Sequence, residues 1–126
     1  FGGCRSATRI VFPKYLTYLP GSGVSFCNYM VEFVFPENVK SISNYFFYGC
    51  ISLKEIVIPD TVTTINFRAF WECTSLTRIT IPASVTKIDS TAFDGCKKDK
   101  LVWVVTRGSY AEKYAKKNYY HYTYAK

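Results

Sequence analysis

The stretch CTSLTRITIPASVTKIDSTAF, residues 73–93, decides the fold of this chain. Its ITI run at 79–81 alternates apolar and polar side chains, which predicts a short strand with one buried face. Pro82 ends that strand, because proline has no N–H to donate to a neighbouring strand. The β-branched run VTKI then predicts a second short extended segment, after which Ala92 and Phe93 fill the core.

This unit recurs along the chain with a period of 23 residues. The cysteines and four of the prolines follow the period: Cys4, Cys27, Cys50, Cys73 and Cys96, and Pro13, Pro36, Pro59 and Pro82. Apolar columns have the same spacing: Ile10, Phe33, Ile56 and Ile79; Phe12, Phe35, Ile58 and Ile81; Leu16, Val39, Val62 and Val85; Leu19, Ile42, Ile65 and Ile88; Phe1, Val24, Phe47, Phe70 and Phe93. Agreement among so many columns predicts a repeat architecture.

A unit of this length cannot bury its apolar face alone. Stacked on its neighbours it can, with strands of successive units pairing in parallel about 4.8 Å apart. The sequence therefore predicts a solenoid that is mostly β and irregular. No segment within the repeats has room for an amphipathic helix of ordinary length.

The segments CISLKEIVIPDTVTTINFRAF and CTSLTRITIPASVTKIDSTAF resemble the BspA-type leucine-rich repeats. The resemblance implies a leucine-rich-repeat solenoid from a cell-surface or secreted protein. It also implies a protein ligand, because members of the family are associated with adhesion to host proteins, including extracellular matrix proteins, and with coaggregation of bacteria.

We expect a single repeat domain over residues 1–126. It divides into a partial repeat at 1–7, repeats at 8–30, 31–53, 54–76 and 77–100, and a C-terminal cap at 101–126. The register breaks at KKDK, where the gap from Cys96 to Leu101 is two residues longer than in the other units. LVWVV then predicts a last strand, and YYHYTY a closing edge strand.

One short helix is expected in the cap. Ser109 and Glu112 have the spacing of a capping box, in which each side chain binds a free backbone N–H of the first turn. An apolar stripe follows on one helix face, and Asn118 is a plausible stop. The stripe consists of Tyr110, Ala111, Tyr114 and Ala115.

Composition bounds the class of protein. A chain of 126 residues forms at most one domain. It has no uncharged apolar stretch long enough to span a bilayer, so we expect no membrane insertion. Because it begins with FGGC and not with Met, we expect that the true N-terminus lies upstream, and the lack of a targeting signal says nothing about compartment.

The net charge of +7 is concentrated in the tail, where residues 97–126 contribute +6. One interpretation is a solvated cap that keeps the end of the solenoid soluble, and the other is a tail that binds polyanions such as glycans or nucleic acid. We favour the solvated cap and expect no nucleic-acid partner, because nucleic-acid modules usually spread basic residues along a face.

The cysteines are too far apart in sequence for a zinc site, which needs close pairs. Neighbouring coils would allow a disulfide by distance alone, but side chains of one column point the same way. His121, the only histidine, lies in the tail and cannot serve Cys73 as a base. We therefore expect buried, reduced thiols, no metal, no cofactor, no catalytic residues and no enzymatic activity.

The positions between the buried strand residues should face outward. They form a strip of small side chains beside a charged row, and two aromatics one coil apart join them as candidates for a protein-binding face: Val11, Val34, Val57 and Thr80; Arg9, Glu32, Glu55 and Arg78; Tyr48 and Trp71. Like charges meet in the row only at Glu32 and Glu55. The competing interpretations are an ordinary solvated sheet face and a structural stalk that presents an upstream domain. We expect a monomer.

Overall fold

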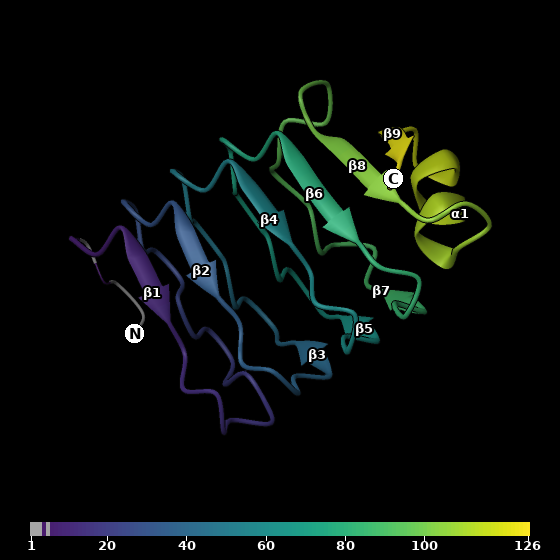
Figure 1. The fold of residues 1–126 in the computed structure, drawn as a ribbon. Helices are drawn as coiled ribbons and strands as arrows, with labels where there is room; N and C mark the ends of the chain where they lie inside the picture. Colours follow the sequence, from purple (N-terminus) through teal and green to yellow (C-terminus); the bar gives the residue numbers. More distant parts are fainter. Residues whose placement is uncertain (1–3, 5) are drawn as a thin grey trace.

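The structure, a computed structural model, describes residues 4 and 6–126. The chain winds into a solenoid whose short strands stack in parallel, with a helix and a final strand at the C-terminal end (Figure 1). The elements are β1 (Arg9–Val11), β2 (Glu32–Val34), β3 (Ser41–Ile42), β4 (Glu55–Val57), β5 (Thr64–Ile65), β6 (Arg78–Ile81), β7 (Lys87–Ile88), β8 (Val102–Val105), α1 (Tyr110–Lys117) and β9 (His121–Tyr124). This architecture confirms the predicted fold.

The strands form three sheets with the predicted register. β1 pairs with β2, β3 with β5, β5 with β7, and β4 with β6, each partner lying 23 residues further along the chain. At β8 the offset becomes 24, since Arg78 pairs with Val102 and Ile79 with Trp103. Of the two extra residues before Leu101, one is absorbed between Leu101 and β8, so the register shifts by a single position.

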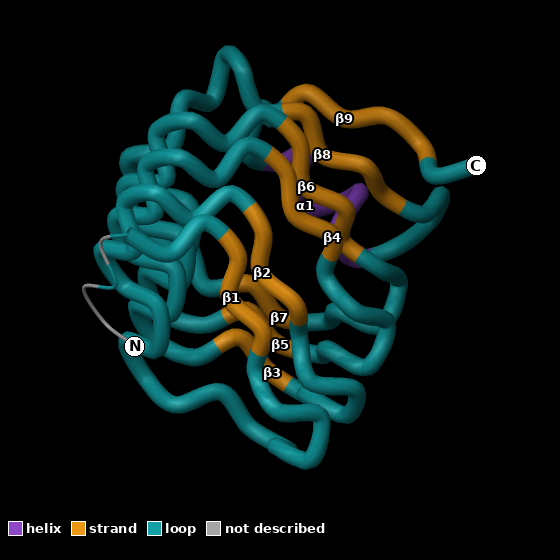
Figure 2. Tube along the Cα trace, turned by 60° about the vertical axis from the view of Figure 1, so that its left-hand side comes forward, coloured by secondary structure: helices purple, strands orange, loops and turns teal. Residues whose placement is uncertain are grey.

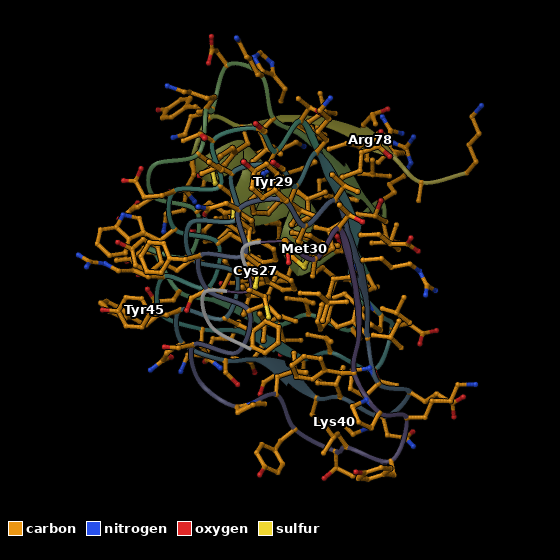
Figure 3. All side chains as sticks on the ribbon, turned by 90° about the vertical axis from the view of Figure 1, so that its left-hand side faces the viewer. Cys27, Tyr29, Met30, Lys40, Tyr45 and Arg78 are labelled. Atoms are coloured by element: carbon orange, nitrogen blue, oxygen red, sulfur yellow. The ribbon has the colours of Figure 1, made fainter. Side chains whose placement is uncertain are left out.

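The apolar columns fill the inside of the coils, as expected. Cys27 and Met30 lie among the core side chains in a view down the stack (Figure 3). The phenylalanine column is stacked, with ring centroids 4.9 Å apart from Phe47 to Phe70 and 5.0 Å apart from Phe70 to Phe93. Phe1, which begins this column in the sequence, lies outside the described residues. Leu16 and Phe35 are only partly buried.

The cysteines follow the core, and no disulfide joins them in the part of the chain that the structure describes. The Sγ of Cys50, Cys73 and Cys96 lies 3.1–3.3 Å from a backbone carbonyl oxygen of the preceding coil, to which it donates. Burial raises the pKa of Cys50 and Cys96 to about 12 and that of Cys73 well above its ordinary value. Cys50, Cys73 and Cys96 are therefore protonated, inert thiols that act as small apolar side chains.

The cap covers the last phenylalanine of the core. Trp103 is fully buried, its ring centroid 5.0 Å from that of Phe93, and the ring of Tyr114 stacks on Trp103 at 5.5 Å. Burial raises the pKa of Tyr114 to about 12. β9 then pairs with β8 in parallel and closes the sheet.

The helix begins and ends where the sequence predicts, with one difference in the capping box. Ser109 Oγ accepts from the Glu112 N–H at 3.2 Å, as expected. Glu112 Oε1, however, accepts from the N–H of Gly108 at 2.7 Å and not from that of Ser109. The Ser109 N–H donates instead to the carbonyl of Thr106, so the neighbouring amide takes its place at the carboxylate.

Candidate protein-binding surface

Two surfaces carry the predicted binding residues, and they lie on opposite sides of the coils. Viewed down the stack, Arg78 projects from the strand side and Tyr45 from the other side (Figure 3). We call them the strand face, made by the outward side chains of β1, β2, β4 and β6, and the aromatic edge, made by Phe26, Tyr45, Tyr48, Phe67, Arg68 and Trp71.

On the strand face the predicted apolar strip is only partly open to solvent. Val11 and Val57 are 47% and 67% exposed, whereas Val34 and Thr80 are half-buried. Val31, which lies outside the predicted strip, adds a further apolar side chain at 54% exposure. It precedes β2 directly, and only its neighbours in space show that it extends the strip.

The charged row beside the strip is paired at one end only. The Nε of Arg9 lies 3.1 Å from Oε1 of Glu32, in an exposed salt bridge across β1 and β2. Glu55 and Arg78 lie opposite each other in the register of β4 and β6. Within the described part of the chain they form no ion pair. Glu55 is thus the less neutralised carboxylate of the row.

The strand face is interrupted between β2 and β4. β1 and β2 form one sheet, while β4, β6, β8 and β9 form another, visible as two groups of strands in Figure 2. The N–H of Val31 donates to Thr8 O and that of Thr77 to Lys54 O, both at 2.8 Å. The equivalent N–H of Lys54 donates to no backbone carbonyl among the described residues.

Within residues 6–126, the backbone hydrogen bond between β2 and β4 is also missing at the other end of the strands. The N–H of Phe12 donates to Val34 O at 3.2 Å and that of Ile58 to Thr80 O at 2.9 Å. Phe35, which is equivalent to both, has no such bond to the β4 segment in the described part of the molecule. The backbone ladder is therefore open between β2 and β4. This is the position in the charged row where the sequence predicts two neighbouring like charges, Glu32 and Glu55.

A cleft lies at this interruption. It has a volume of about 270 Å³ and is lined by Val31, Glu32, Phe33, Glu55, Ile56 and Val57. Its floor is apolar, because Phe33 and Ile56 belong to the buried columns. The other four lining residues, Val31, Glu32, Glu55 and Val57, are exposed to solvent.

The aromatic edge brings Tyr48 and Trp71 together. Their rings stack at 4.5 Å with an interplanar angle of 15°, and Phe26 packs on Tyr48 at 4.4 Å. The guanidinium of Arg68 lies over Trp71, 4.1 Å from the ring centroid. Because stacking and this cation–π contact occupy the ring faces, the edge holds neighbouring coils together and presents ring rims to solvent.

Backbone conformation explains why sequence reasoning missed Phe26. It has a φ of 58°, in the left-handed region, and the equivalent residues Gly49, Glu72 and Gly95 also have positive φ. Phe26 lies across Gly49, where an added Cβ would be 2.8 Å from its ring. Phenylalanine is unusual at such a φ. In the sequence, only Gly49 and Gly95 indicate that this position of the repeat has a left-handed backbone.

Several basic side chains of residues 97–126 are already in contact with other groups of the C-terminal cap. The Nζ of Lys98 donates to Asn118 O at 2.8 Å, Arg107 lies 4.0 Å from the ring centroid of Tyr124, and Lys116 lies 3.9 Å from Glu112. Lys113 and Lys117 line a pocket of about 340 Å³ with Ser90, Tyr110, Tyr114 and Asn118. The tail therefore does not form one continuous cationic surface.

Other chemistry has little support in the described residues. His121 lies exposed on β9, and across residues 4 and 6–126 no cluster of histidine, cysteine or carboxylate side chains could hold a metal ion. A cavity of about 530 Å³ is lined by residues of the first coil that lie between Phe12 and Ser25, at the end of the described stack. No helix among these residues could cross a membrane.

Stacked short strands, a 23-residue register and buried aliphatic columns define a leucine-rich-repeat solenoid. The model of the BspA type leucine-rich repeat region matches residues 1–102 in six copies. The chain belongs to this family, as the resemblance implied. The repeat boundaries given above stay a prediction.

Solved structures of bacterial leucine-rich repeat proteins have the same fold. A protein from Bacteroides ovatus is 32% identical with a TM-score of 0.74, over 84% of this chain. A cell surface protein from Faecalibacterium prausnitzii is 26% identical with a TM-score of 0.71, over 89% of the chain. A T. pallidum protein is 28% identical with a TM-score of 0.74, over 80% of the chain.

The match covers only part of those proteins, namely 27%, 35% and 47% of their chains in the same order. No curated protein matches the chain. The family and fold identify a repeat scaffold of a kind that generally carries no catalytic site and generally binds proteins through its extended surfaces.

Proposed function

We propose that this chain is a non-catalytic, monomeric protein-binding module of a cell-surface or secreted protein, acting in adhesion to host or neighbouring-cell proteins. The observation that carries the proposal is the strand face, where exposed valines lie beside a charged row and an open cleft. Such a face offers apolar contact area with a polar rim, the usual composition of a protein interface. The cell surface protein from F. prausnitzii supports the location.

The strand face is a stronger candidate than the aromatic edge. Trp71 and Tyr48 already stack on each other, and Arg68 covers Trp71. A ligand at that edge would reach the ring rims, whereas the valines of the strand face are free to lose solvent on binding. The principal contacts are therefore assigned to the strand face, with the aromatic edge secondary.

The experiment measures binding of the purified chain to immobilised extracellular matrix proteins. Val57→Asp should abolish binding, because it places an uncompensated charge in the apolar strip. Thr63→Asp is the matched control, since Thr63 is exposed on the β5 side of the coil. Trp71→Ala should weaken binding less than Val57→Asp does.

Three results would contradict the proposal. Absence of binding to any matrix protein would favour the structural stalk. Equal losses in Val57→Asp and Thr63→Asp would remove the strand face from the interface. Capture on heparin that collapses as salt rises, with no effect of Val57→Asp, would favour the basic tail as a polyanion site.

A further inference from the structure

We propose that the cleft between β2 and β4 binds an arginine side chain of the protein ligand. The inference deepens the proposed function and rests on it in assigning the occupant to a protein. It depends on three properties of the cleft: its width, its apolar floor and the two exposed glutamates that line it.

Width excludes an inserted strand and favours a side chain. Cα atoms of β2 and β4 come within 8 Å of each other. A strand inserted between them would need twice the normal spacing, about 9.6 Å. The volume of about 270 Å³ is also below the ~300–1,000 Å³ of small-molecule sites. A single long side chain that enters from the strand face is narrow enough for the distance between the two strands and small enough for the volume of the cleft.

The lining suits a side chain with an apolar stem and a cationic head. Val31 and Val57 are exposed, whereas Phe33 and Ile56, which also line the cleft, are buried. Glu32 and Glu55 belong to the two strands that flank the opening. A stem of methylene groups gains apolar contact while its charged end stays at the wet rim, the arrangement that lysine and arginine adopt on protein surfaces.

Arginine fits better than lysine because of the two carboxylates. Its planar guanidinium presents several N–H donors in a fixed fork, which can bind carboxylates from two directions. Lysine presents a compact, strongly hydrated charge without that geometry. An arginine placed here also brings a positive charge between the two glutamates that line the cleft.

The neighbouring charges orient the ligand. Arg9 and Arg78 occupy the outer positions of the row, one coil beyond each glutamate. They repel a second basic side chain on either side of the cleft and favour acidic ones there. Because Arg9 already binds Glu32 at 3.1 Å, Glu55 provides the larger share of the attraction.

The test uses three blocked tripeptides as probes: Gly-Arg-Gly, Gly-Lys-Gly and Gly-citrulline-Gly, the last being a neutral isostere of arginine. Each is titrated into the ¹⁵N-labelled chain while backbone amide shifts are followed. The arginine peptide should give saturable shifts centred on Val31, Glu32, Glu55 and Val57. The citrulline peptide should bind about tenfold more weakly, and the lysine peptide should fall between them.

Variants locate the site. Glu55→Gln should weaken the arginine peptide about threefold to tenfold, while Asp60→Asn, which removes the same charge from another exposed position, should have no effect. Equal binding of arginine and citrulline, equal effects of the two variants, or shifts centred elsewhere would overturn the inference. So would the same shifts produced by calcium alone, or by raising the protein concentration without peptide.

The outcome separates this inference from the proposed function. Matrix binding that is lost in Val57→Asp, with no saturable response to the arginine peptide, would retain the strand face as an interface and remove arginine as its occupant. Saturable arginine binding without matrix binding would retain the cleft and remove the adhesive function.

Discussion

The N-terminal sheet, β1 and β2, and the C-terminal sheet, β4, β6, β8 and β9, are built from the same repeat but packed differently. Inside the N-terminal coils lie rings: Phe33 contacts Phe12 at 5.1 Å and Phe46 at 5.4 Å between centroids. At the equivalent positions the C-terminal coils have isoleucines and Ala69. The core is therefore filled by aromatic rings beneath β2 and by smaller side chains beneath β4, and the change occurs between these two strands.

That junction explains the open ladder. Larger side chains beneath β2 than beneath β4 favour a displacement of the two strands, and the like charges of Glu32 and Glu55, which line the cleft between them, oppose their approach. Elsewhere the same two coils remain joined: β3 pairs with β5, and the Gly49 N–H donates to Trp71 O at 2.8 Å. The solenoid is thus continuous along two sides and open on the third, so the repeat can present a cleft without losing its stack.

The largest expected effect is at the cap of the C-terminal sheet. Trp103→Ala should lower the free energy of unfolding by about 3–5 kcal/mol, since it empties a fully buried site between Phe93 and Tyr114. Trp71→Ala, at the partly exposed aromatic edge, should cost clearly less. Urea denaturation of both variants measures the difference, and equal losses would contradict the described role of the cap.

A second prediction addresses the aromatic packing of the N-terminal coils. A Cβ on Gly23 would lie 2.0 Å from the ring of Phe46, so Gly23→Ala should destabilise by about 1–3 kcal/mol. In a Phe46→Ala background the same substitution should cost nothing further. Gly21→Ala is the control, since its nearest atom is 3.8 Å away. Additive losses in the double variant would show that ring size is not the constraint.

A smaller effect should follow pH at the cap. The hydrogen bond from Tyr124, followed by that from the Gly108 N–H, holds the pKa of Glu112 below its ordinary value of 4.5. A lowered pKa means that this stabilisation is complete above that value and is lost as the pH falls below it. Glu112→Gln should lack this part of the dependence. Urea midpoints on both sides of pH 4.5 test it, and parallel pH profiles would contradict it.

Sequence periodicity predicted most of the fold because each column repeats one physical requirement. A position that is buried in one coil is also buried in the next. The apolar residues Ile56 and Ile79, 23 residues apart, therefore predict the same buried strand position in both coils, and these strands are β4 and β6. Ser109 located the helix because a cap has a local signal. Glu112 bonded differently than expected, since several neighbouring amides lie within reach of one carboxylate.

The open ladder could not be predicted in this way. The sequence showed that Glu32 and Glu55 are neighbours of like charge, but backbone pairing depends on the sum of packing beneath both strands. Likewise, the side chains of Tyr48 and Trp71 were predicted as neighbours one coil apart, while their stacking and the cover by Arg68 depend on rotamers and on left-handed backbone at Arg68 and Phe26.

Amide hydrogen exchange distinguishes an open backbone ladder between β2 and β4 from a closed one. Lys54 lacks the backbone bond that its equivalents Val31 and Thr77 form at 2.8 Å. After correction for intrinsic rates, the Lys54 amide should exchange about tenfold or more faster than those two, because protection follows local hydrogen bonding. Equal protection at Val31, Lys54 and Thr77 would mean a closed ladder and would contradict the cleft.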